Sequence, residues 1–427
     1  MGTPAPAGAP KRFGTSMAWV SCGSVNPGWE PVRTAFDRVL HHDRAGASVA
    51  VVRRGQLVVD LWGGADPVSG QRWDEQSVTL GFSTAKGIVA LLCAQEIQAG
   101  RLHPDQPVAD SWPEFGAAGK AEITVGQVLT HTAGMVTVPA RRPEELLDPA
   151  ALTARLAEQP PDYRPGSARL YHVLSYGTIL AEVLRRVTGR DIGQLVAERI
   201  AGPLGVSAWF GMPTEAERRY LPAVLEPVQP IGATPAFADV PPMQRLLCGV
   251  RHQAQAQVVP LFVRRDGTAG SELVNSTAFR SAQIPAGGLV CDARALALVY
   301  GACLSPISQV GSGSVRLLDE ASVAQVATDH LRGIAEPRCE GTAVPTDRWG
   351  LGFEISHRAC PMLGPGSFGH AGMGGRLGFA HRGSAIGFGF VAQRMRFPTD
   401  GVDPRWRVLL RAVRDCAHRE RLRARIG

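Results

Sequence analysis

Segments with the pattern of β-strands occur near both ends of this chain, and the long stretch between them reads mainly as helix. Apolar, β-branched runs on either side of Arg53-Arg54-Gly55 predict a hairpin near the N-terminus. The strands are expected at residues 46–52, 56–62, 349–356, 368–373, 376–381 and 386–393. This order predicts one antiparallel sheet that is shared by both ends of the chain, with a helical domain inserted between them.

The domain boundaries follow from the patterns along the chain. Residues 1–28 are predicted to be a flexible N-terminal tail. Residues 29–80 and 340–427 together form the predicted α/β sheet domain, and residues 81–339 form the mainly helical domain. Residues 225–275 are rich in Pro, Gln and Val, and we interpret them as a lid or an insertion. Helices are expected at residues 30–41, 83–99, 174–187, 192–200, 292–303 and from 404 onward.

The net charge of +7 raises the question of nucleic-acid binding. Much of this charge lies at one place, because eight arginines occur between Arg405 and Gly427. The same segment is amphipathic, with Trp406 and Leu410 on one face and the arginines mostly on the other. Solvation alone accounts for such an arginine-rich face, so we expect no nucleic-acid partner.

The sequence carries no signal for a membrane or a metal. No run approaches the roughly 18 apolar residues that a membrane span needs, and the N-terminal residues lack the apolar core of a secretory signal. We therefore expect a cytoplasmic protein. The eight cysteines are scattered without a C-x-x-C pair, which indicates reduced thiols rather than a disulfide framework or a zinc site. We expect no cofactor.

A candidate nucleophile and its base lie three residues apart at Ser83 and Lys86, at the start of the apolar helix 83–99. Residues at this spacing share one helix face, within hydrogen-bond reach. Lysine is rare here: the chain has three lysines among 45 basic residues. Arginine cannot act as a base, whereas a buried lysine can lose its proton. Spacing alone leaves two interpretations open, a catalytic base and an ordinary solvated lysine.

The position of Ser83 at a helix start also suits a nucleophile, because free backbone N–H groups and the positive end of the helix dipole can stabilise an oxyanion. His131, in the segment 129–134, is expected to be a structural histidine, since no partner histidine lies at metal-ligand spacing. The literal G-x-G-x-x-G at residues 364–369 precedes a strand rather than a helix, so we interpret it as a glycine turn.

Three short motifs occur in an order that resembles the serine β-lactamase and penicillin-binding protein superfamily. They are the S-x-x-K box Ser83 to Lys86, the tyrosine box Tyr171-His172-Val173 and the third box His370-Ala371-Gly372. The chain is most similar to the class C β-lactamase-related branch, which includes family VIII carboxylesterases, D-aminopeptidases and acyltransferases. Segments 129–134 and 349–352 resemble accessory segments of the same fold. The resemblance covers roughly residues 30–420.

The resemblance implies the β-lactamase-like fold and a role for each motif residue. It implies that Ser83 attacks a carbonyl while Lys86 and Tyr171 relay the proton, and that the backbone N–H groups of Ser83 and Met373 form the oxyanion hole. It places substrate contacts at His172, His370, Ala371 and Gly372. No metal is part of this arrangement.

Two departures from the lactamase motifs narrow the range of substrates that we expect. Val173 stands where lactamases have an asparagine that contacts the substrate amide, and His370 stands where they have the lysine of K-T-G. We therefore expect a serine enzyme that forms an acyl-enzyme from a small carboxylic ester and hydrolyses it. The alternative is a transacylase of secondary metabolism that passes the acyl group to an amine or alcohol. A β-lactamase, a D-aminopeptidase and an inactive binding protein are less favoured.

Overall fold

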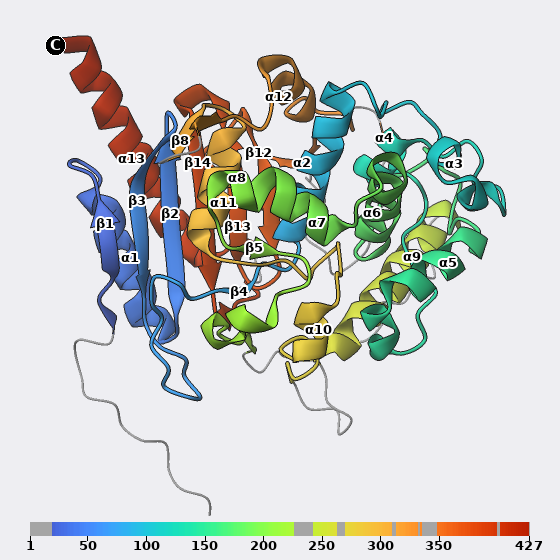
Figure 1. The fold of residues 1–427 in the computed structure, drawn as a ribbon, viewed down its shortest axis with the longest axis horizontal. Helices are drawn as coiled ribbons and strands as arrows, with labels where there is room; N and C mark the ends of the chain where they lie inside the picture. The colour runs from blue at the N-terminus through green and yellow to red at the C-terminus, as the bar shows by residue number, and fades with distance from the viewer. Residues whose placement is uncertain are drawn as a thin grey trace, which may run out of the picture.

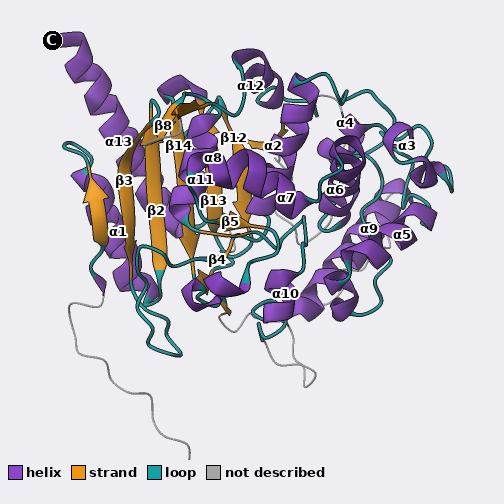
Figure 2. Cartoon of the chain, viewed as in Figure 1, coloured by secondary structure: helices purple, strands orange, loops and turns teal. Residues whose placement is uncertain are grey.

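An eight-stranded antiparallel sheet, built from both ends of the chain, forms the centre of the fold (Figures 1 and 2). The computed structural model describes residues 19–225, 242–262, 270–309, 313–331, 334, 348–398 and 402–426. The strand order is β1-β3-β2-β14-β13-β12-β11-β10. The strands are β1 (Cys22–Val25), β2 (Ala47–Arg53), β3 (Gln56–Gly63), β10 (Arg348–Trp349), β11 (Glu354–Ile355), β12 (Ser367–Gly372), β13 (Arg376–His381) and β14 (Ile386–Ala392). N-terminal β2 pairs with C-terminal β14 over all seven residues, which confirms the predicted shared sheet.

Both faces of this sheet are covered by helices, as Figure 2 shows. The main helices are α1 (Glu30–Asp43), α2 (Thr84–Gln98), α6 (Ser175–Thr188), α11 (Ala293–Ala302) and α13 (Pro404–Ile426). Side chains alternate along a strand, so Val49 and Val51 of β2 join the core under α1 and α13, while Ala50 and Val52 join the core with α2 and α11. All seven residues of β2 are therefore buried, as the apolar run in the sequence requires.

Glycines in β14 let helix α11 lie directly on the sheet. A Cβ atom at Gly389 would be 2.0 Å from the carbonyl oxygen of Ala293, and one at Gly387 would be 2.3 Å from that of Ala297. A side chain at either position would push the helix away. Helix α11 thus belongs to the sheet layers, although it falls within the residues 81–339 that we assigned to the helical domain.

Helix α2 is the central helix of the molecule, packed between the sheet and the helical region (Figure 1). It contacts β12 on one side and α6 on the other. Its residues are apolar almost all round, which is the pattern of a helix buried on every side. Around it, α4 (Val125–Leu129) and α7 (Ile192–Val196) each begin with a capping box, at Thr124 and Asp191.

Several predicted elements differ from the observed ones. Cys22–Val25, placed in the N-terminal tail, forms the edge strand β1 because its backbone pairs with β3. The strand expected at 349–356 is two short strands, since a turn closed by Gly350 N–H and the Phe353 carbonyl separates them. The helix expected at 192–200 continues as a π-helical turn over Ala197–Ala201. The other expected helices are present, with ends within two residues of those predicted.

Some predictions fall partly or wholly outside the described residues. These are the tail over residues 1–18 and, within the predicted lid or insertion 225–275, residues 226–241 and 263–269. The part between them forms α9 (Pro242–Val258) and a 3₁₀ turn, η6 (Val259–Phe262). Cys248 in α9 is disulfide-bonded, so the expectation of reduced thiols is wrong for this residue. Within the described residues, no helix is both long and apolar enough to cross a membrane.

Candidate active site

Ser83 and Lys86 lie at the N-terminal end of the central helix. Ser83 is the N-cap residue of α2, and Lys86 Nζ is 3.3 Å from Ser83 Oγ. Phe82, directly before the serine, has a φ of +48°, a left-handed conformation that is costly for an aromatic residue. Strained backbone of this kind is typical of active sites. The tight turn turns the half-buried Ser83 side chain toward Lys86.

The amine of Lys86 is completely buried, and its burial lowers its pKa from 10.5 to about 7. Its second contact is the carbonyl oxygen of Ala286, at 2.8 Å. This carbonyl belongs to a turn that packs closely on α6, because a Cβ atom at Gly177 would be 2.5 Å from the Ala286 nitrogen. A neutral amine is thus within reach at neutral pH, as a general base requires.

Tyr171 and His370 lie beside this pair. The Tyr171 ring faces Lys86, with Nζ 5.0 Å from the ring centroid, and its hydroxyl is 3.5 Å from His370 Nε2. His370 Nδ1 is 2.6 Å from the carbonyl oxygen of Ala371, so Nδ1 carries the proton that it donates there. In the neutral ring, Nε2 is then the acceptor for the Tyr171 hydroxyl. The structure thus brings Ser83, Lys86, Tyr171 and His370 together from three separate segments.

The imidazole of His370 is neutral at physiological pH. Its side chain is 3% exposed, and burial lowers its pKa to about 4 although the Glu354 carboxylate acts in the opposite direction. The lysine of a K-T-G motif would supply a positive charge at this place. His370 supplies a hydrogen-bonding group without that charge.

The His172 side chain, which we expected to contact substrate, is bound to backbone groups. It is fully buried, its Nδ1–H donates to the Leu170 carbonyl at 2.6 Å, and its Nε2 accepts from Met135 N–H at 3.1 Å. Both ring nitrogens are therefore occupied by backbone groups. His172 instead fixes the loop that carries Tyr171, because its own N–H donates to His131 Nδ1 at 3.0 Å.

His131, for which we expected a structural role, lies among aromatic rings beside the tyrosine. Its fully buried ring has its centroid 4.7 Å from each of the ring centroids of Tyr171, Tyr176 and Trp349. Burial lowers its pKa well below the usual value, which keeps the ring uncharged. Its Nε2 has no hydrogen-bond partner within the part of the chain that the structure describes.

The end of β12 lies against the loop before Ser83. A Cβ atom at Gly372 would be 2.3 Å from the carbonyl oxygen of Gly81, so only glycine fits at this position. This contact sets the backbone that follows Gly372, beginning with Met373, beside the start of α2. The expected oxyanion groups, the N–H of Ser83 and of Met373, thus belong to two neighbouring pieces of backbone.

Arg376 holds the loop 373–375 in place, a role that our reading of the sequence missed. Its completely buried guanidinium donates to the carbonyl oxygens of Met373 and Gly374, each at 3.3 Å, and to that of Leu80 at 3.1 Å. Burial, together with the nearby charge of Arg405, lowers its pKa to about 9. One side chain thereby connects the loop to the strand that leads into the nucleophile.

The start of α13 braces the same loop from the other side. Arg405 Nη2 donates to the Gly374 carbonyl at 2.6 Å, and Trp406 Nε1 donates to the Gly375 carbonyl at 2.9 Å. Arg405 is in turn paired with Asp43 at 2.8 Å and with Asp403 at 2.6 Å. The one signal for these residues in the sequence is the presence of arginines in otherwise apolar segments.

The Glu354 side chain forms a hydrogen bond with the backbone of the third box, His370-Ala371-Gly372. Its carboxylate accepts from Ala371 N–H at 2.9 Å and lies 2.7 Å from His357 Nε2. Burial alone would raise the pKa of Glu354, but the hydrogen bonds and the charge of His357 lower it to about 2. Ala371, expected to contact substrate, therefore has its N–H bound to Glu354 and its carbonyl bound to the His370 ring.

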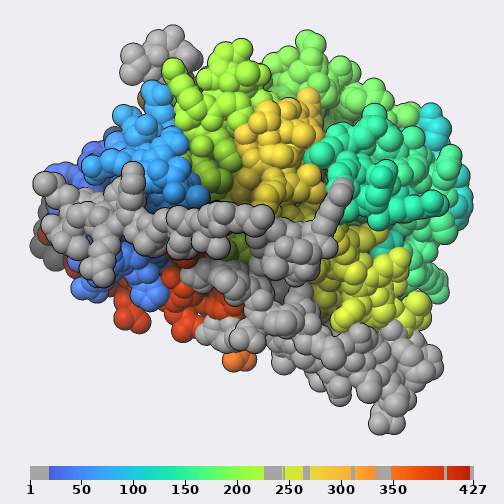
Figure 3. Space-filling model, turned by 90° about the horizontal axis from the view of Figure 1, so that it is seen from below, coloured from blue at the N-terminus to red at the C-terminus, as the bar shows by residue number. Residues whose placement is uncertain are grey.

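Apolar side chains surround the nucleophile on the side of the helical region. Phe82, Met373, Val138 and Leu146 belong to one apolar cluster, and the Phe82 ring centroid is 5.8 Å from that of Phe262 in η6. Helix α9 is joined to this wall because the Gln257 side chain binds the backbone of Val138. In the view from below, the yellow-green surface of α9 adjoins the teal surface of the helical region (Figure 3).

The described residues contain no group of three or more His, Cys, Asp or Glu side chains suited to hold a metal ion. The polar groups that converge near Ser83 are one amine, one phenol and one neutral imidazole. This set can move a proton to and from a hydroxyl nucleophile.

Known proteins resemble this chain over most of its length. The family model described as Beta-lactamase matches residues 32–412. Esterase/beta-lactamase LipL from Mycobacterium tuberculosis is 30% identical over 383 residues, which cover 88% of this chain and 83% of that protein. A crystal structure of a family VIII carboxylesterase has a TM-score of 0.76 at 29% identity and covers 93% of this chain and 99% of its own. The structure of EstA from Arthrobacter nitroguajacolicus Rue61a also has a TM-score of 0.76 at 29% identity. It covers 92% of this chain and 98% of its own.

The bracing of loop 373–375 predicts that Arg376→Lys lowers kcat for an ester substrate by about 10²-fold, the cost of a small misplacement of a reacting group. Lysine keeps the charge but cannot reach three carbonyl oxygens at once. We expect KM to change less than kcat, and the measurement is steady-state kinetics together with a melting curve. Arg382→Lys, at an exposed arginine in the 3₁₀ turn that follows β13, is the control. Unchanged kcat in folded Arg376→Lys would show that the loop does not depend on this guanidinium.

Proposed function

Because this chain belongs to the beta-lactamase family, whose model matches residues 32–412, we propose that it is a serine esterase that forms an acyl-enzyme on Ser83. The observation that carries the proposal is the 3.3 Å distance between Ser83 Oγ and Lys86 Nζ, whose burial lowers its pKa to about 7. The two other groups, Tyr171 and His370, complete a proton-relay set around the serine.

Acylation begins when Ser83 Oγ attacks the carbonyl carbon of the ester and its proton passes to Lys86 Nζ. The electrons of the C=O bond move to the oxygen, and the N–H groups of Ser83 and Met373 stabilise this oxyanion. The oxyanion then collapses, the bond from carbon to the alcohol oxygen breaks, and the alcohol leaves with the proton returned from Lys86 through the Tyr171 hydroxyl.

Deacylation repeats these steps with water as the nucleophile. The water oxygen attacks the acyl carbon and gives a proton to the relay. Ser83 Oγ then leaves and takes this proton back. In total, ester and water are converted to acid and alcohol. The Tyr171 ring stabilises the transient Lys86 ammonium by a cation–π contact at 5.0 Å. His370 orients the Tyr171 hydroxyl by accepting its hydrogen bond.

The proposed substrate is an ester with an apolar acyl or alcohol part. The wall that contains Phe82, Met373 and Phe262 favours such a group by burial of its surface. A β-lactam is less favoured, because the neutral His370 cannot pair with the carboxylate of that ligand class. Esterases as well as β-lactamases occur among the relatives of this chain.

A fluorophosphonate probe tests the nucleophile. We expect intact-mass analysis to find one adduct per chain, located at Ser83, because the serine hydroxyl at the helix start lies beside a neutral amine. Ser83→Ala should abolish both the adduct and ester turnover. Undiminished labelling of Ser83→Ala would place the nucleophile elsewhere.

The pKa of Lys86 predicts the pH dependence of the reaction. A general base acts in its deprotonated form, so kcat/KM should rise with pH through about 7 and then level off. Lys86→Arg should lose about 10² to 10⁴ of the rate, since a guanidinium keeps its proton. A flat profile between pH 6 and 8, or near-normal turnover by Lys86→Arg, would mean that Lys86 serves only as a charge.

A transacylase is the second candidate, and the apolar wall at Phe82 and Phe262 favours it by limiting the access of water. Water at about 55 M is outcompeted only where the site orients the acceptor, a gain that can reach effective molarities of about 10⁵ M. We expect an apolar alcohol or amine at millimolar concentration to give measurable exchange product from an activated ester. If free acid is the only product across a panel of acceptors, the protein is a hydrolase alone.

A further inference from the structure

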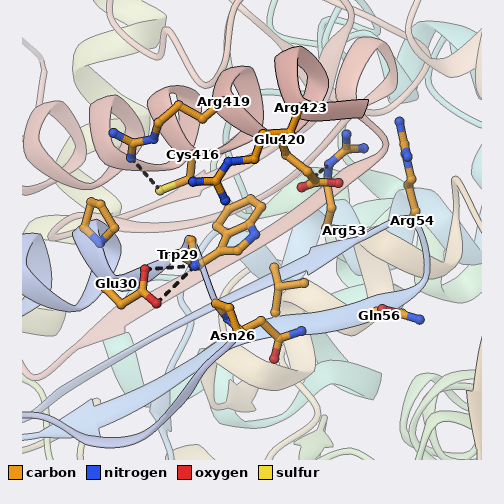
Figure 4. Close-up of a pocket in the computed structure, with 14 residues that line it drawn as sticks. Asn26, Trp29, Glu30, Arg53, Arg54, Gln56, Cys416, Arg419, Glu420 and Arg423 are labelled. Atoms are coloured by element: carbon orange, nitrogen blue, oxygen red, sulfur yellow. Dashed lines mark hydrogen bonds and ion pairs between the residues drawn. The ribbon is translucent and has the colours of Figure 1, made fainter. Parts of the chain in front are cut away.

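A cavity lies away from Ser83, where the end of α13 passes over the start of α1 and the turn between β2 and β3 (Figure 4). Its volume is about 670 Å³, within the range of small-molecule sites. None of the groups assigned to the active site lines it. The cavity therefore needs an explanation that ester cleavage does not provide.

The lining of this cavity is strongly basic. Four arginines and two glutamates contribute to it, which leaves two net positive charges: Arg53, Arg54, Arg419, Arg423, Glu30 and Glu420. Figure 4 shows Arg53 and Arg54 toward one end of the cavity and Arg419 toward the other, with Trp29 between them. Like charges gathered around one hollow repel each other, so an anion in the hollow would be stabilised.

The two carboxylates have partners of their own, and they offset two of the four positive charges. Glu30 accepts from Gly28 N–H at 2.9 and 3.0 Å, and Glu420 lies 3.4 Å from Arg53 Nε. Arg53 is 4% exposed, and its side chain donates to the Ser384 carbonyl. Its Nε and Nη2 have no hydrogen-bond partner in the described part of the chain, but the ion pair with Glu420 balances its charge. The excess positive charge therefore lies on the outer arginines.

The outer arginines are free to bind a ligand. Arg419 and Arg423 are one turn apart on α13, and both are exposed residues that line the cavity. Within the described residues, neither Arg54 nor Arg423 makes a hydrogen bond or an ion pair with its side chain, and Arg419 donates to the sulfur of Cys416. The nearby carboxylate of Glu30 attracts both Arg419 and Arg423. A guanidinium fork matches the paired oxygens of a phosphate.

The rest of the lining suits a small organic group. The Trp29 indole and Val58 provide apolar surface, and the side-chain amides of Asn26 and Gln56 can bind hydroxyl groups. We propose that this cavity is a binding site for a phosphate-bearing small molecule, with the phosphate held by Arg419 and Arg423. A phosphate monoester carries close to two negative charges near neutral pH, which equals the excess charge of the lining.

Calorimetric titration of the full chain with glycerol 3-phosphate and, separately, with inorganic phosphate tests the site. We expect saturable binding of one equivalent that weakens as salt is raised. Arg419→Gln/Arg423→Gln should weaken it by about 10²-fold, because two charge-assisted hydrogen bonds are lost together. Arg411→Gln/Arg414→Gln removes the same charge from exposed positions of the same helix that do not line the cavity, and should bind normally.

A vesicle arm distinguishes a soluble phosphate from a lipid headgroup. Binding to vesicles of phosphatidic acid in phosphatidylcholine, but to neither soluble compound, would assign the phosphate to a headgroup, provided that the Arg419/Arg423 variant loses it and the control variant keeps it. Equal weakening in the two double variants would show general attraction to a basic helix and overturn the proposal. Absence of saturable binding in every arm would overturn it too, and the melting curve of each variant verifies that it is folded.

Discussion

The antiparallel pairing of β2 with β14 is the interaction on which the rest of the structure depends. It joins strands from opposite ends of the chain, so every other layer has to be arranged around a sheet that neither end can complete alone. Helices α1 and α13 bury one face of this sheet and α11 buries the other, where glycines in β14 permit close contact. The same sheet carries β12, and through it the third motif, to the start of α2.

Burial is the physical effect that gives the site its chemistry. The Lys86 amine lies in the core with Ser83 Oγ and the Ala286 carbonyl as its contacts, and desolvation rather than a neighbouring cation lowers its pKa. Desolvation also keeps His370 neutral. One low-dielectric environment thus favours the uncharged form of two groups, the Lys86 amine beside Ser83 and the His370 ring beside Tyr171.

Buried arginines position the backbone of the site. Arg376 and Arg405 bind carbonyl oxygens of the loop 373–375, and the charge of Arg405 is balanced by Asp43 and Asp403. A carbonyl that accepts from a fixed guanidinium cannot rotate freely, so its peptide group is held in one orientation. The loop therefore relies on side chains from β13 and α13, and a carboxylate at the end of α1 supports it indirectly.

The sequence by itself determined the fold class, most helices and the three motifs that meet near Ser83, because these depend on local periodicity and on residue types at short spacings. It did not reveal that His172 is buried against backbone groups, that Arg376 and Glu354 support the site, or that Cys22–Val25 joins the sheet. Each of these depends on contacts between segments far apart in the chain. The pKa of Lys86 and the basic cavity under α13 were likewise decided only by the tertiary structure, since burial and the meeting of distant charges have no signature in local sequence.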